Sequence, residues 1–393
     1  MRFWMLAFFL LLPMADAAGD WALSDVCPAG FVLESGGPRK AGCYLRSFYR
    51  SFDSLQNAGV GGLQTGLPPL REGFPPQQID LGRLLFFDPV LSVDGSLACA
   101  SCHDPQQGFA DGRALSPGVN GLQTGRSTPS LWNVGFLKRL TWDGRAHNLE
   151  EQAQGPLFAS NEMGTSPERL ATTLNGIAAY RPLFAQAYGG QEPIEPAQVY
   201  AALAAFQSTL VSLNSRYDLY ALGFHDALSE PEIEGLNVFR SFVARCAECH
   251  TPPLFTNQQI AVIGTPEPEG RSLDPGAQKP GGDTSQRGGF KVPSLRNISR
   301  TAPYMHSGRF KTLREAVAFY NGGRGHAMPP GEKLSLHWHI WEPQLTEDEI
   351  DRLVDFLQTL TDETFVPQTP ERVPSGLSPG GSRALAAYTP IHK

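Results

Sequence analysis

Two pentads of cysteine and histidine are the strongest chemical signal in the chain. They read Cys99-Ala100-Ser101-Cys102-His103 and Cys246-Ala247-Glu248-Cys249-His250. Two cysteines three positions apart can form thioethers with the two vinyl groups of one haem, and the adjacent histidine can then bind the iron. The alternative is a zinc site with four cysteines, which would not require a histidine after both pairs. The pentads therefore predict two covalent c-type haems with His103 and His250 as proximal ligands.

The other two cysteines, Cys27 and Cys43, lie near the N-terminus, behind an export signal. The signal consists of Arg2, an apolar stretch over 3–12 and a small-x-small cleavage motif at 15–17. The apolar stretch is shorter than the roughly 20 residues that span a bilayer. We therefore expect a cleaved signal peptide over 1–17, no membrane span in the mature chain and, in a Gram-negative bacterium, a periplasmic location. In that oxidising compartment Cys27 and Cys43 are expected to form a disulfide.

Composition narrows the class of protein. The chain has 393 residues, of which 41% are apolar and only 18% charged, and it contains 41 glycines and 33 prolines. These values indicate a compact protein with long ordered loops rather than a disordered one. The net charge of −7 argues against nucleic acid and anionic membrane surfaces as partners.

The elements that must position the pentads are mostly helical. Apolar residues recur at helical spacing over 196–213, and capping boxes begin at Ser229 and Thr346. A helical apolar run enters each pentad, over 81–87 and 236–243. Strand-like alternation is scarce. The fold class is therefore mainly α, with two cytochrome c-like haem domains and long ordered loops.

This pattern divides the chain into five parts. An N-terminal extension over 18–76 follows the signal peptide. A first haem domain spans 77–225 and a second spans 226–365, and a Pro-, Ser- and Gly-rich tail occupies 366–393. We expect the tail either to wrap the surface or to be mobile.

Several segments of the two predicted haem domains resemble the bacterial di-haem cytochrome c peroxidase and MauG family. The likeness runs in order over about 77–362 and excludes the extension and the tail. The segments are 81–89 (LGRLLFFDP), 141–146 (TWDGRA), 155–156 (GP), 161–163 (NEM), 291–297 (KVPSLRN) and 301–308 (TAPYMHSG).

The resemblance implies a division of labour between the two haems. The haem on His103 would react with hydrogen peroxide, and the haem on His250 would relay electrons or oxidising equivalents. Trp142 matches the tryptophan between the haems, although it could also be a core residue beside Arg145. Gln152 and Glu162 match residues above the peroxide-binding iron. Breaking the O–O bond needs a proton moved from one oxygen to the other, which a carboxylate can do while an amide positions the peroxide.

The resemblance also implies a calcium site. Thr301 and Pro303 match positions whose backbone carbonyls hold calcium between the domains, an oxygen-rich site suited to a hard cation. Ser127 stands where the family typically has an asparagine ligand.

Two departures favour the MauG-like branch. The peroxidase branch caps the first iron with a histidine where this chain has Val119, and the second iron with a methionine where it has Tyr320. MauG-like enzymes share both departures and oxidise residues of a partner protein. Other candidates for the distal ligand of the second iron are Met305, His306, His326 and Met328. The remaining histidines lack a surrounding motif, and we expect most of them at the surface or in packing: His147, His225, His337, His339 and His392.

The sequence thus predicts a periplasmic di-haem peroxidase that uses hydrogen peroxide to oxidise a protein partner. One alternative is a peroxidase that takes electrons from a small cytochrome or copper protein. An alternative of another class is a di-haem electron-transfer protein without enzymatic activity.

Overall fold

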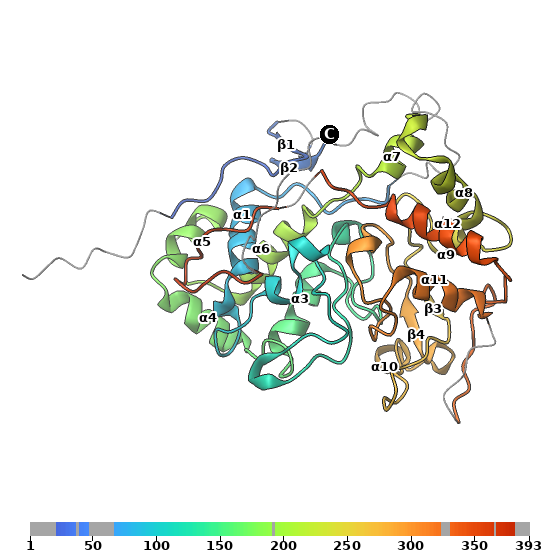
Figure 1. Ribbon diagram of the computed structural model, residues 1–393. Coiled ribbons are helices and arrows are strands. Elements are labelled where there is room, and N and C mark those ends of the chain that lie inside the picture. The colour runs from blue at the N-terminus through green and yellow to red at the C-terminus, as the bar shows by residue number, and fades with distance from the viewer. Residues whose placement is uncertain are drawn as a thin grey trace, which may run out of the picture.

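The computed structural model describes residues 21–36, 39–46, 67–190, 193–323, 331–364 and 367–381. The predicted signal peptide, His326, Met328 and His392 lie outside these residues. The fold is mainly helical, as the sequence predicted, and Figure 1 shows its two halves side by side.

Twelve α-helices and four short strands make up the regular structure of the described residues. The first half of the chain holds helices α1 Pro76–Phe87, α2 Cys99–Cys102, α3 Leu149–Phe158, α4 Pro167–Gly176, α5 Tyr180–Tyr188 and α6 Pro196–Ser208. The second half holds α7 Arg216–Ala221, α8 Glu230–Phe239, α9 Cys246–Cys249, α10 Gln278–Gly281, α11 Leu313–Asn321 and α12 Glu347–Gln358. The strands are β1 Phe31–Glu34, β2 Gly42–Leu45, β3 Ile260–Val262 and β4 Gly289–Lys291.

Each half has its own hydrophobic core, built around one crossing of two helices. A Cβ atom at Gly82 of α1 would collide with the carbonyl oxygen of Ala202 on α6. A Cβ atom at Gly235 of α8 would collide in the same way with Arg352 on α12. The missing side chain lets the two helices of each pair approach closely. Because each glycine lies on the helix that precedes a pentad, the two halves repeat one architecture.

The second core begins earlier in the chain than expected. Tyr217 and Ala221 of α7 are buried in the second core, together with Leu236 and Phe356. Packing therefore joins α7, which precedes residue 225, to the second core.

Helix α6 ends at Ser208, although apolar spacing predicted a helix to residue 213. Asn133 holds the chain beyond this end. Its side-chain amide donates to Ser212 O at 3.0 Å, and its side-chain oxygen accepts from Ser212 N at 3.0 Å. A distant side chain thus fixes the backbone there as non-helical, which periodicity cannot reveal.

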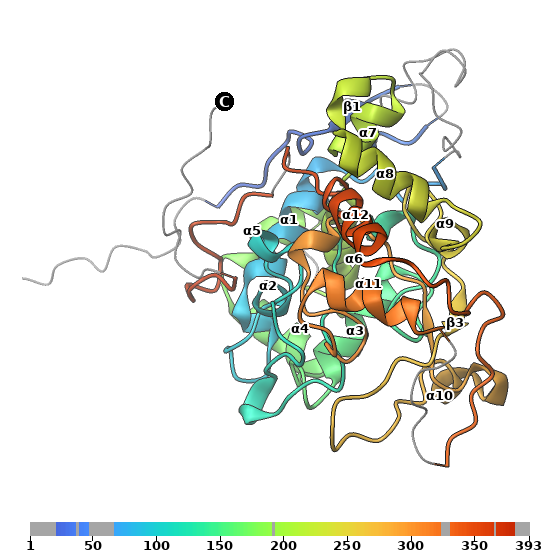
Figure 2. The same ribbon diagram turned by 45° about the vertical axis from the view of Figure 1, so that its right-hand side comes forward.

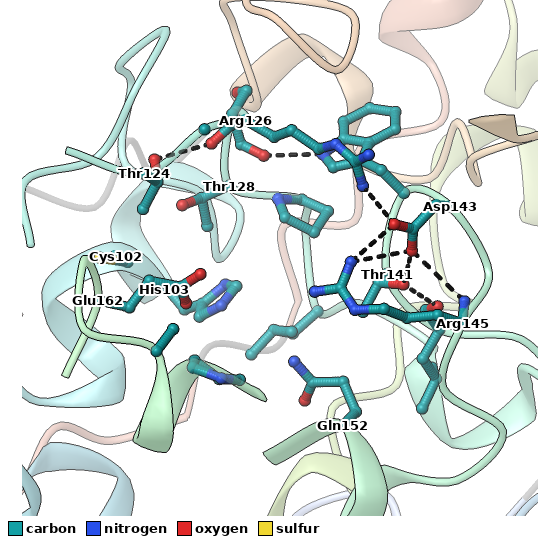
Figure 3. Close-up of a pocket in the computed structure, with 18 of the residues that line it drawn as sticks. Cys102, His103, Thr124, Arg126, Thr128, Thr141, Asp143, Arg145, Gln152 and Glu162 are labelled. Atoms are coloured by element: carbon teal, nitrogen blue, oxygen red, sulfur yellow. Dashed lines mark hydrogen bonds and ion pairs between the residues drawn. The ribbon is translucent and has the colours of Figure 1, made fainter. Parts of the chain in front are cut away.

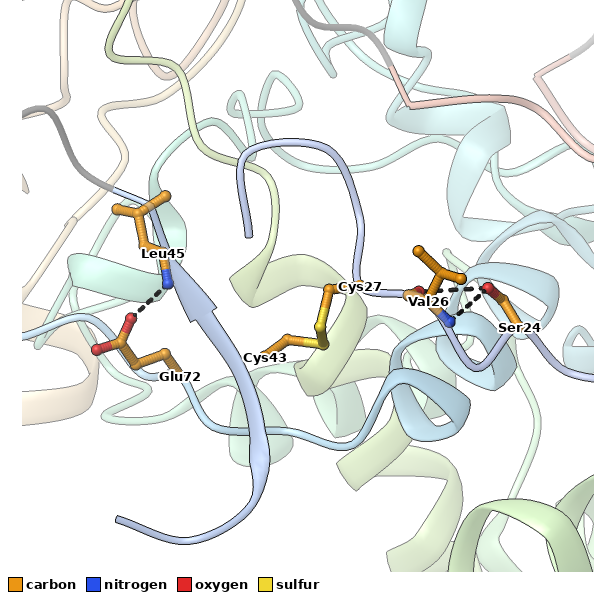
Figure 4. Close-up of a disulfide and its surroundings, with 6 residues drawn as sticks. All are labelled: Ser24, Val26, Cys27, Cys43, Leu45 and Glu72. Carbon is orange, nitrogen blue, oxygen red and sulfur yellow. Dashed lines mark hydrogen bonds between the residues drawn. A yellow bond between two sulfur atoms is a disulfide. The ribbon is translucent and has the colours of Figure 1, made fainter. Parts of the chain in front are cut away.

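The N-terminal extension contains structure that the sequence did not predict. Strands β1 and β2 pair antiparallel, with Leu33 opposite Cys43. The expected disulfide joins Cys27 to Cys43, with the Cα atoms 5.6 Å apart (Figure 4). Cys43 N also donates to Phe74 O at 2.8 Å, which attaches the hairpin to the segment entering α1.

Residues 367–381 of the tail pack against the first domain (Figures 1 and 2). Val373 belongs to the first core, and Gly380 N donates to Phe87 O at 2.8 Å. Ser375 Oγ donates to Asp88 Oδ1 at 2.6 Å. This part of the tail therefore wraps the surface, one of the two expected outcomes.

Strands β3 and β4 form a second antiparallel pair, with Ile260 opposite Lys291. This pair lies in the second half of the chain, and β4 leads directly to the segment beside the second pentad. Among the described residues, every helix is too short or too polar to cross a membrane.

Candidate active site

Both pentads fold as one helical turn, α2 and α9, and each turn presents its histidine in the same way. His103 Nδ1 lies 2.9 Å from Phe109 O, and His250 Nδ1 lies 3.1 Å from both Phe255 O and Pro293 O. The two phenylalanines are buried and adopt left-handed backbone, with φ of 58° and 54°. This conformation turns each carbonyl toward a histidine. It leaves Nε2 of each imidazole for a metal, the arrangement that orients histidine ligands in proteins.

The protonation of the histidines suits iron. Burial lowers the pKa of His103, and it lowers the pKa of His250 to about 4. Hydrogen bonds to backbone carbonyls favour the charged form of each ring but do not outweigh burial. Both rings are therefore neutral at neutral pH, which is the form that ligates a metal. None of the four pentad cysteines forms a disulfide, so each sulfur can form a thioether. Two thiols and one neutral imidazole at each turn match what a covalent c-type haem requires.

A cavity of about 1340 Å³ adjoins the first pentad. Cys99, Cys102 and His103 line it, and Gln152 and Glu162 line it as well (Figure 3). Its volume is of the size that a large planar cofactor with a small co-substrate needs. The structure thus brings together the three attachment residues and both residues that the sequence placed above the first iron.

Glu162 follows α3 in a tight turn. Its backbone nitrogen donates to Ala159 O at 3.0 Å, and its carbonyl accepts from Val119 N at 2.9 Å. Burial raises the pKa of the Glu162 carboxyl, and the nearby charge of Arg145 opposes that rise only in part. A carboxyl with a raised pKa can take up and release a proton near neutral pH more readily than an exposed one.

Gln152 is positioned by helix α3. Asn148 caps this helix, with its side chain accepting from Glu151 N at 2.8 Å, and Gln152 N donates to Asn148 O at 3.0 Å. Figure 3 shows the Gln152 amide directed into the cavity from a different side than Glu162. An amide and a carboxyl therefore face one space from two elements.

Trp142 has contacts toward both pentads. It lines the first cavity, and its indole Nε1 donates to Ser127 O at 2.7 Å. Its carbonyl accepts from Lys291 N at 2.7 Å, and Lys291 precedes by two residues the Pro293 carbonyl that contacts His250. The indole thus lines the cavity beside the first pentad, and the backbone carbonyl of Trp142 is bonded to β4, which leads to the second pentad.

An ion network that the sequence analysis missed borders the same cavity. Arg126 bonds Asp143 at 2.7 Å, and Arg145 bonds Asp143 at 2.8 Å (Figure 3). Arg126 also bonds Asp274 at 2.6 and 2.8 Å. Burial raises the pKa of Asp143, but bonds from Arg126 and Thr141 outweigh it and hold the pKa below its ordinary value. Because Asp274 belongs to the second domain, Arg126 links the two domains.

Tyr320 faces the second pentad. Desolvation of the phenol oxygen, and then the nearby Cys246 and Cys249, raise its pKa, although 37% of the residue's surface is exposed to solvent. A metal ion would have to offset this rise for the phenol to ionise. Among the other candidates for this position, His306 is already engaged. Its Nε2 lies 2.7 Å from Glu267 Oε1, and its ring stacks on Phe290 at 3.8 Å.

His337 and His339 also gather at the second pentad, where the sequence carried no signal for them. One ring nitrogen of His337, one ring nitrogen of His339 and Cys249 Sγ all lie within 4.8 Å of one another. Only the folding of the loop after α11 reveals this arrangement.

In the region expected to hold calcium, Ser127 is bonded to two other segments of the chain. Ser127 N donates to His306 O at 2.7 Å, and Ser127 Oγ donates to Arg113 O at 3.4 Å. Arg113 N in turn donates to Asp111 Oδ1 at 3.0 Å. Within the described chain, Asp111 Oδ2 and Ser307 Oγ are buried side-chain oxygens without a hydrogen-bond partner. Such oxygens are compatible with a hard cation.

Comparison with known proteins agrees with this geometry. The family model described as di-haem cytochrome c peroxidase matches residues 76–226. A methylamine utilization protein MauG from Methylorubrum extorquens is 37% identical over 306 residues, which cover 77% of this chain and 84% of the relative. A cytochrome c551 peroxidase from Nitrosomonas europaea is 32% identical over 308 residues, covering 78% and 86%.

Solved structures give the same picture. A MauG-like protein associated with microbial copper homeostasis superposes with a TM-score of 0.71 at 33% identity, covering 80% of this chain and 99% of that one. The di-haem peroxidase BthA from Burkholderia thailandensis superposes with a TM-score of 0.64 at 26% identity, covering 91% and 99%.

Proposed function

Since this chain belongs to the di-haem cytochrome c peroxidase family, and is therefore a peroxide-using enzyme with two c-type haems, we propose that it uses hydrogen peroxide to oxidise a protein partner. We place it in the periplasm, because the first 17 residues have the pattern of a cleaved signal peptide.

The observation that carries this proposal is the side chain at position 119. Val119 is buried and its backbone nitrogen bonds Glu162 O, so this residue packs against the turn that holds the proposed catalytic carboxyl. Valine has no atom that can bind iron. An iron held by His103 would therefore receive no ligand from position 119, so peroxide could reach it in the oxidised protein without prior reduction.

Glu162 and Gln152 are the proposed catalytic pair at this open face. When bound, the first haem supplies an iron that accepts peroxide and provides electrons to the breaking O–O bond. Glu162 takes a proton from one peroxide oxygen and returns it to the other, so that water leaves. Gln152 holds the peroxide by hydrogen bonds without competing for the proton, because an amide does not titrate in this range.

Trp142 and Tyr320 are proposed to serve the second haem. Trp142 provides a π-system between the sites, supported by its bonds to Ser127 and Lys291. Tyr320 is proposed as the distal ligand, supported by the position of its phenol near both pentad thiols. An ionised phenol is a hard anionic ligand that favours the more oxidised states of iron, as in catalases.

We also propose a calcium ion held by the carbonyls of Thr301 and Pro303. The partnerless oxygens of Asp111 and Ser307 support it, since they offer ligands in place of the missing asparagine amide. Metal analysis of the purified holoprotein should find one calcium per chain, which a calcium chelator removes with a fall in thermal midpoint. A chain without calcium and without this shift would refute the site.

A spectrum of the oxidised holoprotein, before and after one equivalent of peroxide, tests the main proposal. We expect one high-spin and one low-spin ferric signal, and an immediate change on adding peroxide. A wholly low-spin protein that reacts only after one-electron reduction would instead support a peroxidase that takes electrons from a small redox protein. A protein that does not react with peroxide in either the oxidised or the one-electron-reduced state would instead be a di-haem electron-transfer protein without enzymatic activity.

A further inference from the structure

The segment over 337–341 (His-Trp-His-Ile-Trp) packs on the second haem site. His337 N donates to Val262 O at 2.8 Å, at the end of β3. Trp341 Nε1 donates to Val243 O at 3.0 Å, just ahead of the second pentad. Both ends of the segment are thus attached beside α9.

His339 connects this segment to the pentad itself. Its Nε2 lies 2.8 Å from Glu248 Oε2, and one of its ring nitrogens lies within 4.8 Å of Cys249 Sγ. In the holoprotein this sulfur is bonded to the haem, so it is not available as the thiolate of a separate metal site. His339 would therefore lie beside the thioether sulfur through which Cys249 holds the second haem.

Trp338 precedes His339 in the chain and lies at the surface. Its ring centroid lies 3.5 Å from that of His339, yet 67% of its surface is exposed to solvent. Burial of a tryptophan is strongly favourable, and an exposed one contributes little to packing. An exposed indole in contact with a haem-edge histidine is thus placed for exchange with a partner rather than for stability.

We propose that Trp338 is the surface electron relay of this enzyme, through which a protein partner is oxidised. This inference rests on the proposed function and adds the residue that the partner meets. Reduction of one peroxide to two waters takes two electrons and two protons. Trp338 gives one electron by way of His339 and Cys249, and then takes one from the partner. Two such one-electron transfers supply the two electrons that each peroxide needs. The two protons come from solvent and from the oxidised partner residues.

A partner protein is too large to enter the cavity at His103, so electrons must cross the surface. Indole is among the most easily oxidised side chains, and Trp338 is separated from the haem-bearing sulfur only by one imidazole. Trp341 is a matched control, because it is also an exposed tryptophan of this segment. Its indole instead bonds Val243 and packs on Arg245, 4.4 Å from the guanidinium carbon.

The test treats oxidised holoprotein with peroxide in the absence of any partner, so that the stored oxidising equivalents oxidise the protein itself. Wild type, Trp338→Phe and Trp341→Phe are compared by electron paramagnetic resonance of freeze-quenched samples and by mass spectrometry of tryptic peptides. We expect a tryptophan radical and oxygen addition at Trp338 in wild type. Both should be lost in Trp338→Phe and retained in Trp341→Phe. Trp338→Tyr should restore a radical, now of tyrosyl type, because a phenol is also oxidisable.

Equal radical yield in Trp338→Phe and wild type, with normal haem spectra, would overturn the relay. So would Trp338 oxidation at an unchanged rate in Glu162→Gln, since bulk peroxide would then be its cause. If wild type does not react with peroxide at all, the proposed function fails before the relay is reached, and the two failures are therefore distinguishable.

Discussion

Replacement of Glu162 by glutamine isolates the proton transfer at the first haem site. Glutamine has the same shape and keeps the backbone bonds of this turn to Val119 and Ala159. It removes only the group that can carry a proton. A positioned acid–base group contributes roughly 10²–10⁴-fold, so we expect the reaction with peroxide to slow by roughly 10²-fold or more.

The pH dependence gives this prediction a second signature. Burial raises the pKa of Glu162 above its ordinary value of 4.5. The base is the ionised carboxylate, and lowering the pH protonates it. The wild-type rate should therefore fall as the pH drops through a midpoint above 4.5, and Glu162→Gln should lack this fall.

The assay is stopped-flow absorbance of the oxidised holoprotein mixed with peroxide over a range of pH. Glu234→Gln is the control, because Glu234 is an exposed carboxylate on α8 in the second domain. If Glu162→Gln reacts as fast as Glu234→Gln and keeps the acid limb, another group moves the proton and Glu162 has a structural role.

Three further substitutions, the last of them with a glycine control, test the electron path, the second haem site and the packing of the second core. Trp142→Phe should leave both haems attached and the first reactive, while oxidation of the second iron, followed by stopped-flow absorbance, slows markedly; an unchanged rate would place the electron path elsewhere. Tyr320→His should give the second haem the low-spin spectrum of bis-histidine ligation and abolish oxidation of a partner; an unchanged spectrum would exclude Tyr320 as the ligand. Gly235→Ala would force Cβ against Arg352 O and to 2.8 Å from Phe356 Cβ, so it should cost about 1–3 kcal/mol and lower the thermal midpoint. Gly176→Ala, at the open end of α4, should leave that midpoint unchanged or raise it slightly.

The helical crossing at Gly82 and Gly235 gives the internal repeat a physical basis. Both glycines lie on the helix before a pentad, and both allow the carbonyl of a partner helix to approach. The buried phenylalanines after the pentads repeat as well, since Phe109 and Phe255 turn their carbonyls toward the two proximal histidines. One architecture therefore serves both pentads.

The tertiary structure also explains how the domains are joined. Arg126 of the first domain bonds Asp274 of the second, and Arg271 Nη2 donates to Gly125 O at 2.6 Å. These contacts lie at the rim of the first cavity, next to Asp143 and Arg145. The lining of this cavity thus includes residues from both halves of the chain.

The sequence by itself determined the chemistry that depends on local covalent patterns. Two cysteines and a histidine within five residues specify haem attachment wherever the chain folds, and capping boxes at Ser229 and Thr346 specify the starts of α8 and α12. The resemblance selected Glu162, Gln152 and Trp142, because short motifs surround each of them.

Only the tertiary structure decided which distant residues meet. The end of α6 depends on Asn133, the link between the two halves on Arg126 and Asp274, and the contact at the second pentad on His339 and Cys249. None of these pairings has a period or a spacing along the chain. They arise because packing brings together segments far apart in sequence, and their contribution depends on distance and burial, which residue order alone does not contain.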